Sequence, residues 1–150
     1  MRIVIQRVAQ SEVTIGGRSV GKIGKGMMIL LGVETADTEE DIEWLCGKIS
    51  RLRIFDDENG VMNRDIQQAE GRAIVISQFT LFASTKKGNR PSYIRSAGEP
   101  IARPMYEKFL ASLSAVLGAE VEHGEFGADM KVSLVNDGPV TICIDTKNRE

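Results

Sequence analysis

Three side chains that can hydrogen-bond a substrate stand close together in an apolar stretch of the sequence. The run of residues 73–83 carries Ser77, Gln78 and Thr80 in its second half. The β-branched residues in this run, and its lack of glycine, proline and charge, predict a strand buried on both faces. Each polar group left without a partner there would cost about 1–3 kcal/mol. These three side chains are therefore expected to bond either to the protein itself or to a ligand.

Hydroxyl and amide groups of this kind are better suited to holding a polar substrate than to attacking it. No Gly-x-Ser-x-Gly elbow surrounds Ser77, and His123 is the only histidine in the chain. A serine hydrolase that uses Ser77 and His123 stays open as an alternative, because the two could meet in three dimensions. Alternate residues of a regular strand face opposite sides. One site could use Ser77, Gln78 and Thr80 together only if a bulge or a strand end redirects a side chain, or if backbone N–H groups take part.

Length and composition predict one domain spanning residues 1–150. With 150 residues, 42% of them hydrophobic, the chain can form a core large enough to fold unaided. It has no apolar run of transmembrane length. Gln6 and Arg7 interrupt the apolar N-terminal segment before it is long enough for a signal peptide. We therefore expect a cytoplasmic protein with no membrane partner. A formal net charge of −2 argues against a protein that coats nucleic acid by bulk charge.

The two cysteines and the single histidine do not form a metal-binding pattern. Cys46 and Cys143 lie far apart, without CxxC spacing, and each stands in an apolar pattern. Both are therefore predicted to be buried free thiols. A zinc site built on two isolated cysteines and His123 is improbable. No metal and no cofactor is expected.

A basic loop follows the polar strand directly. Residues 86–95 contain four cations and no acid, and Gly88 and Pro91 give the segment the composition of a loop. Lys86, Lys87 and Arg90 would suit the phosphates of a nucleic acid. Four exposed cations are also ordinary for a protein surface, and the sequence leaves both readings open.

The predicted elements give an α/β protein of the α+β type. It has a strand-rich antiparallel or mixed sheet, or a barrel-like β core, with two main helices packed on it. The opening strands are expected to form an antiparallel meander, with a hairpin at residues 16–17. The expected strands cover residues 1–9, 13–15, 19–23, 27–33, 73–83, 119–122, 130–135 and 140–144.

Capping signals mark both predicted helices. The first spans about residues 39–53, with Thr38 as its N-cap and Asp41 at the third helical position. Pro104 is placed in the first turn of the second helix, which Gly118 ends.

The segment Asn136-Asp137-Gly138-Pro139 is predicted to be a hairpin turn between the last two strands. Asp-Gly supplies the positive φ that tight turns require. Only about 5–6% of X-Pro bonds in folded proteins are cis, so this composition alone does not predict a cis Pro139.

Two motifs resemble the signature motifs of the D-aminoacyl-tRNA deacylases, which edit chirality in translation. They are Ser77-Gln78-Phe79-Thr80-Leu81 and Asn136-Asp137-Gly138-Pro139-Val140-Thr141. Other segments also fit the pattern of that family in order, with Tyr93 where the family more often has Phe. These segments are Ile5-Gln6-Arg7-Val8, Leu30-Leu31-Gly32-Val33, Arg53-Ile54-Phe55, Met62-Asn63, Gly88-Asn89-Arg90-Pro91-Ser92 and Phe126-Gly127-Ala128-Asp129-Met130.

The resemblance implies a homodimer that acts on the aminoacylated end of tRNA, and not on DNA, without a metal. A cis Gly138–Pro139 of one subunit would enter the pocket that residues 77–81 build in the other. There it would leave no room for an L side chain, whereas glycine would be accepted. The 2′-hydroxyl of the terminal adenosine would assist cleavage of the ester. The resemblance thus implies site residues Ser77, Gln78, Phe79 and Thr80, with Phe79 contributing its backbone N–H.

A protein of another class stays open as a further alternative. A dimeric RNA-binding module could use the polar strand to hydrogen-bond or stack bases without chemistry. Phe79 and Phe82 beside the basic loop would suit such a role.

Overall fold

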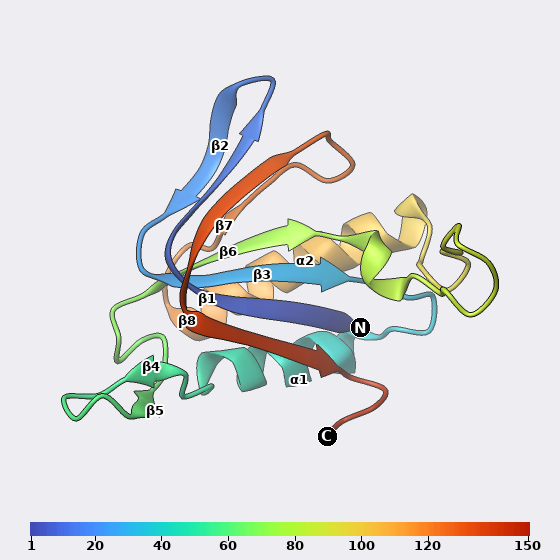
Figure 1. Ribbon diagram of the computed structural model, residues 1–150. Coiled ribbons are helices and arrows are strands. Elements are labelled where there is room, and N and C mark those ends of the chain that lie inside the picture. The colour runs from blue at the N-terminus through green and yellow to red at the C-terminus, as the bar shows by residue number, and fades with distance from the viewer.

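The computed structural model describes residues 1–150 and contains a mixed β-sheet with two helices packed on one face (Figure 1). The predicted α+β class is confirmed. The elements are β1 (Arg2–Ile15), β2 (Arg18–Ile23), β3 (Gly26–Gly32), α1 (Glu39–Ser50), β4 (Phe55–Asp56), β5 (Met62–Arg64), β6 (Arg72–Ser77), the 3₁₀ turn η1 (Phe79–Phe82), α2 (Glu99–Leu117), β7 (Glu122–His123) and β8 (Lys131–Asp145).

β1 is the central strand of the main sheet, whose order is β2-β1-β3-β6-β7, with β8 paired to the other edge of β1. The 14-residue length of β1 makes this possible, because its second half pairs with β2 and its first half with β3. The predicted meander is therefore wrong: the opening strands are antiparallel, but β3 pairs with β1 and not with β2. The pairs β3–β6 and β6–β7 are parallel.

The sheet curls until it is nearly closed and barrel-like. β2 approaches β7 so closely that a Cβ atom on Gly21 would lie 2.6 Å from the carbonyl oxygen of His123. β8 pairs with β1 and with no other strand, so its outer edge is free in this chain.

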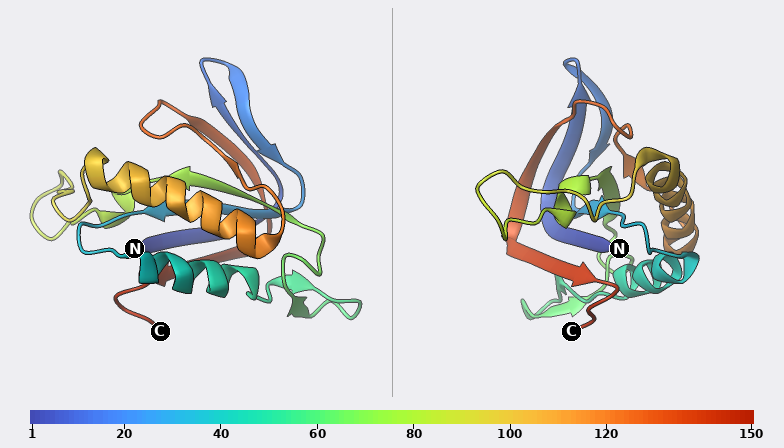
Figure 2. Two further views of the ribbon diagram at one scale, coloured as in Figure 1. Left: turned by 180° about the vertical axis from the view of Figure 1, so that it is seen from behind. Right: turned by 90° about the vertical axis from the view of Figure 1, so that its right-hand side faces the viewer.

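α1 and α2 cover the face of the sheet opposite the viewer of Figure 1, as the two views of Figure 2 show. The main core lies between the helices and the sheet and includes Ile29, Leu45, Val75 and Phe109, all 0% exposed. Cys46 belongs to this core as predicted, and burial raises the pKa of its thiol to about 12. None of the helices combines the length and the hydropathy needed to cross a membrane.

The prediction of a buried Cys143 is wrong. Its thiol is free but exposed, because Cys143 lies on β8 between Ile142 and Ile144. Those two neighbours pack against the core, so the alternation of the strand turns the cysteine away from it.

α1 begins with a capping residue, whereas α2 follows Gly98 and has no side-chain cap. Thr38 is the N-cap of α1, and its N–H donates to the Asp41 carboxylate at 2.8 Å, as predicted. α1 ends at Ser50, three residues before the predicted end. α2 begins at Glu99, so Pro104 lies inside the helix and not in its first turn. Burial of Tyr106, Phe109 and Leu113 stabilises α2 despite the hydrogen bond that an interior proline removes.

Candidate functional site

Only the first half of the run of residues 73–83 is a strand. Residues 73–76 are buried in β6 as predicted, but β6 ends at Ser77 and the chain then turns into η1. The Gln78 N–H makes the last bond to the sheet, 2.8 Å from the carbonyl oxygen of Leu31. The prediction of a strand through residue 83 is therefore wrong. Ser77, Gln78 and Thr80 are half-buried, and strand alternation does not separate them.

Gly32 makes room for η1 on the sheet. A Cβ atom there would lie 3.1 Å from both the carbonyl oxygen of Gln78 and the Cβ of Leu81, and 3.2 Å from the ring of Phe82. These separations are tighter than nearly all real Cβ contacts. A side chain at the end of β3 would therefore press η1 away from its present position by a few tenths of an ångström or more.

Tyr106 supports β6 from the helical side. Its hydroxyl donates to the carbonyl oxygen of Val75 at 3.0 Å, and burial raises its pKa. The hydrogen bond joins α2 to β6 two residues before Ser77.

A cavity of about 340 Å³ opens where β3, β6 and η1 end. Ser77, Gln78 and Phe79 line it, together with the start of α2 and the segment before β8. Thr80 does not line it, but its hydroxyl oxygen accepts a hydrogen bond from the Gln78 side-chain amide. The remaining lining residues are Leu31, Val33, Ile76, Ser96, Ala97, Ala102, Phe126, Gly127, Ala128, Asp129, Met130 and Val132.

The cavity has polar groups for holding a substrate but no nucleophile paired with a base. Asp129 is its only lining residue with an ionisable side chain, and this carboxylate forms an exposed ion pair with Lys131 at 2.9 Å. His123 does not line the cavity, and its Nδ1 lies 2.6 Å from the carbonyl oxygen of Gly124. The geometry therefore does not favour a hydrolase that uses Ser77 and His123.

Aromatic and basic residues lie outside the cavity beside Phe79. The rings of Phe79 and Tyr93 meet edge to face, with centroids 5.0 Å apart, and they are 54% and 37% exposed. Lys86, Lys87 and Arg90 are exposed on the loop, as predicted, but none of them lines the cavity.

The predicted hairpin at residues 136–139 is wrong, because this segment is a bulge within the single long strand β8. Gln6 pairs with Thr141 and Val8 pairs with Asn136, so residues 137–140 lie opposite Arg7 alone. Gly138 has a φ of +144°, and the Gly138–Pro139 peptide bond is cis. Both residues are exposed.

Arg7 secures this bulge, and the sequence reasoning did not select it as a site residue. Its Nε donates to the carbonyl oxygen of Asp137 at 2.8 Å, and its Nη1 donates to Ile54 O at 2.8 Å and to the Asp56 carboxylate at 3.0 Å. The Arg7 side chain is only 8% exposed. An arginine within a buried apolar strand is the sequence signal that could have identified it, because such a charge needs partners.

The structure brings together only part of the predicted site. Ser77, Gln78 and Phe79 meet at the cavity, and Thr80 joins them through Gln78. Gly138 and Pro139 do not line the cavity of their own chain. Residues 126–130 form a wall that only the family resemblance indicated, since a single Asp129 among small and apolar residues is not a pattern typical of a site.

Comparisons with known proteins agree over the whole chain. A family model described as D-Tyr-tRNA(Tyr) deacylase matches residues 4–145. Proteins named D-aminoacyl-tRNA deacylase from Bacteroides fragilis (strain YCH46) and Flavobacterium johnsoniae are 66% and 59% identical to it over 150 residues, which is all of this chain and all of each relative. A solved structure described as "c-Myc DNA Unwinding Element Binding Protein" superposes with a TM-score of 0.91 at 36% identity, covering 97% of this chain and 99% of the other. The chain belongs to the D-aminoacyl-tRNA deacylase family.

Proposed function

We propose that this protein hydrolyses the ester that joins a D-amino acid to the terminal adenosine of tRNA. Water adds to the ester carbonyl, and the products are the free amino acid and tRNA with its hydroxyl restored. The observation that carries the proposal is a cavity lined by Ser77, Gln78 and Phe79 in a chain of this family. Ser77 and Gln78 would orient the ester, with the backbone N–H of Phe79 directed at its carbonyl.

Water is the nucleophile, and in this proposal the substrate supplies the group that assists its attack. The cavity offers no protein base beside a hydroxyl, which is consistent with assistance from the 2′-hydroxyl of the terminal adenosine. Glycyl-tRNA would be a second substrate, because a site that excludes L side chains sterically does not exclude an amino acid without one.

Rejection of L substrates would come from a second copy of the chain. Gly138 and Pro139 are exposed on a bulge and do not line their own cavity, which supports a role in the cavity of a partner. The free edge of β8 and the exposed Val132 and Val135, at 37% and 49%, support a homodimer contact nearby. Sedimentation as a monomer at micromolar concentration would contradict this arrangement.

The test measures deacylation of D-tyrosyl-, L-tyrosyl- and glycyl-tRNA. Wild type is expected to hydrolyse the D and glycyl substrates and to spare the L substrate. Ser77→Ala and Thr80→Ala are expected to lower kcat about tenfold or more, through loss of positioning, whereas His123→Ala should stay within about twofold of wild type. A large loss with His123→Ala would support a serine hydrolase instead. Equal hydrolysis of the D and L substrates by wild type would refute the chiral filter.

Gly138→Ala provides a sharper arm of the same assay. A Cβ atom on Gly138 would lie 2.8 Å from the side chain of Val140, so the bulge must shift. Hydrolysis of the L substrate relative to the D substrate is expected to rise about tenfold. Gly60→Ala is the matched control, because Gly60 also has a positive φ but has nothing within 4 Å.

The tRNA phosphates would contact the loop that carries Lys86 and Lys87. Binding of tRNA is then expected to weaken as salt rises, and the Lys86→Ala/Lys87→Ala variant should show a salt slope shallower by about 1–2. The Lys22→Ala/Lys25→Ala variant is the control, because it removes two exposed lysines from the end of β2 and the turn that follows it. Figure 1 shows this turn at the side of the molecule opposite the loop that follows η1. Identical slopes for wild type and the loop variant would show that the loop does not bind phosphates.

A binding module without chemistry is a second candidate. The exposed pair of Phe79 and Tyr93 beside a basic loop supports it, since such rings stack on bases of any sequence. Nucleic-acid binding by a wild-type protein that hydrolyses none of the three aminoacyl-tRNAs would favour this candidate.

A further inference from the structure

The carbonyl oxygen of Leu81 lies near the end of η1, directly after Thr80. The last carbonyl groups of a helical turn have no partner within the turn. The guanidinium of Arg2 supplies one, because its Nη1 donates to Leu81 O at 3.2 Å. The same guanidinium lies over the ring of the buried Phe82, 4.7 Å from the centroid. Arg2 therefore contacts two of the four residues of η1.

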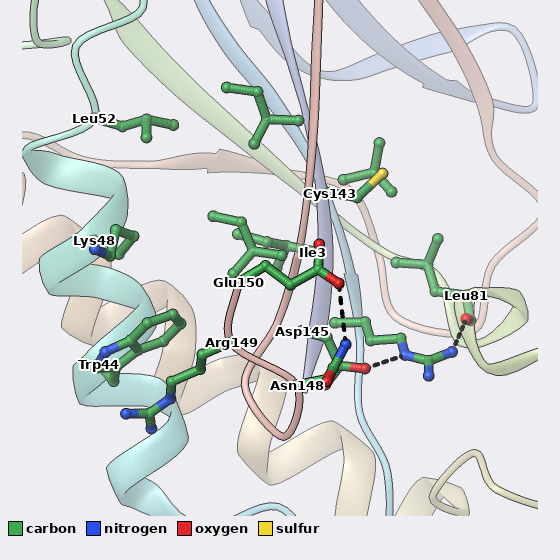
Figure 3. A pocket seen from close by; sticks show the side chains of 14 residues that line it. Ile3, Trp44, Lys48, Leu52, Leu81, Cys143, Asp145, Asn148, Arg149 and Glu150 are labelled. Atoms are coloured by element: carbon green, nitrogen blue, oxygen red, sulfur yellow. Dashed lines mark hydrogen bonds and ion pairs between the residues drawn. The ribbon is translucent and has the colours of Figure 1, made fainter.

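Asp145 anchors this guanidinium. Arg2 and Asp145 are opposite each other in the β1–β8 register, and Arg2 Nε donates to Asp145 Oδ2 at 2.8 Å (Figure 3). Burial alone would raise the pKa of Asp145, but hydrogen bonds from the Arg2 side chain and the Lys147 N–H outweigh burial and lower it. The carboxylate thus stays charged at neutral pH and holds the guanidinium.

The backbone of Arg2 is fixed as firmly as its side chain. Arg2 pairs with Gly32 of β3 on one side and with Asp145 of β8 on the other. Gly32 is also the residue against which η1 lies. One arginine thus joins β3, β8 and the turn that follows Ser77.

The surroundings offer no substitute for Arg2. A second cation, Arg95, lies 5.5 Å from the Phe82 centroid, but its guanidinium bonds to Glu34 and to no carbonyl of η1. Leu81 and Arg2 both line a cavity of about 620 Å³, whose other walls come from β1, α1, β8 and the C-terminal residues (Figure 3). Little protein therefore packs on the cavity side of Leu81 to hold the turn once the guanidinium is removed.

We propose that Arg2, anchored by Asp145, is a positioning residue that holds η1, and thereby Gln78 and Thr80, in the geometry that the substrate ester requires. Only the kinetic consequence rests on the proposed function. The hold of Arg2 on η1 is a property of the folded chain and can be measured without a substrate.

Amide hydrogen exchange measures directly how strongly Arg2 stabilises η1. The N–H of Leu81 bonds to Gln78 O at 3.3 Å, and that of Ala83 bonds to Thr80 O at 3.0 Å. Both amides are expected to exchange at least about tenfold faster in Arg2→Ala, whereas the amide of Leu31 in β3 should be unchanged. Asp145→Asn keeps the shape of the anchor without its charge, and we expect an intermediate increase. Unchanged exchange at the amides of Leu81 and Ala83 in Arg2→Ala would overturn the proposal.

Kinetics then test the consequence for the reaction. Arg2→Ala is expected to lower kcat on D-tyrosyl-tRNA about tenfold with KM within about twofold, and Arg2→Lys should recover part of the loss. Arg64→Ala breaks an exposed ion pair with Glu58 at 2.8 Å, away from η1, and is the control. Faster exchange with wild-type kcat would refute the positioning role. If exchange is faster in Arg2→Ala but the wild-type protein deacylates none of the substrates, the stabilisation of η1 by Arg2 is supported and only the proposed function is refuted.

Discussion

An Arg7→Met variant is expected to lose about 3 kcal/mol of unfolding free energy and most of its discrimination between D and L substrates. Methionine fills a similar volume but has no donor, so Ile54 O and Asp137 O both lose the partner that lies 2.8 Å away. The bond to Ile54 O is buried and that to Asp137 O is part-buried, and a buried carbonyl without a partner costs about 1–3 kcal/mol. Discrimination falls because the Asp137 carbonyl belongs to the bulge that presents Gly138. Denaturant unfolding and the ratio of D to L deacylation measure the two effects.

Arg72→Met is the matched control for this variant. The Arg72 guanidinium also bonds to a backbone carbonyl, that of Glu120 at 2.9 Å, but its side chain is 48% exposed. Water replaces the lost donor there, so we expect a change below about 1 kcal/mol and normal discrimination. If Arg7→Met were as stable as Arg72→Met, the buried guanidinium would not be what secures the bulge.

A Gly32→Val variant is expected to fold but to deacylate about a hundredfold more slowly. The new side chain would begin 3.1 Å from Gln78 O and from the Cβ of Leu81, so η1 must move away from the sheet. A displacement of about 1 Å at positioning groups can cost on the order of 10² in rate. We expect the loss in kcat, and single-turnover deacylation of D-tyrosyl-tRNA measures it.

Gly24→Val separates this effect from a general cost of adding a side chain to a glycine. Gly24 lies in the turn between β2 and β3 and has nothing within 4 Å of an added Cβ atom. Its kcat should stay within about twofold of wild type. A Gly32→Val enzyme with normal kcat would mean that the position of η1 does not control the reaction.

The sequence predicted those elements that local residue chemistry determines. Thr38 and Asp41 cap α1 as expected, and the β-branched residues 74–76 form a buried strand. The end of that strand could not be predicted from composition, because Phe79 and Leu81 are as apolar as strand residues. The turn depends on Gly32, which lies in another strand. A glycine has no side chain, so it adds nothing to the hydrophobic or polar pattern from which elements are predicted.

The bulge was missed for a related reason. Asn136, Asp137 and Gly138 have the composition of a hairpin turn, and nothing in their own residues distinguishes a turn from a bulge. The difference lies in Arg7, which pairs across the sheet and binds the Asp137 carbonyl. The family resemblance indicates Gly138 and Pro139, but the contact of Arg7 with the bulge depends on the pairing of β1 with β8, which the sequence does not show.

The bulge in β8 has a further consequence for solubility. A long strand with a free edge is a template for pairing with other chains, which leads to aggregation. The bulge divides the free edge of β8 into residues 131–136 and 141–145, so an intruding strand meets no continuous ladder of 15 residues. The same distortion that exposes Gly138 and Pro139 therefore also protects the protein against uncontrolled edge-to-edge polymerisation.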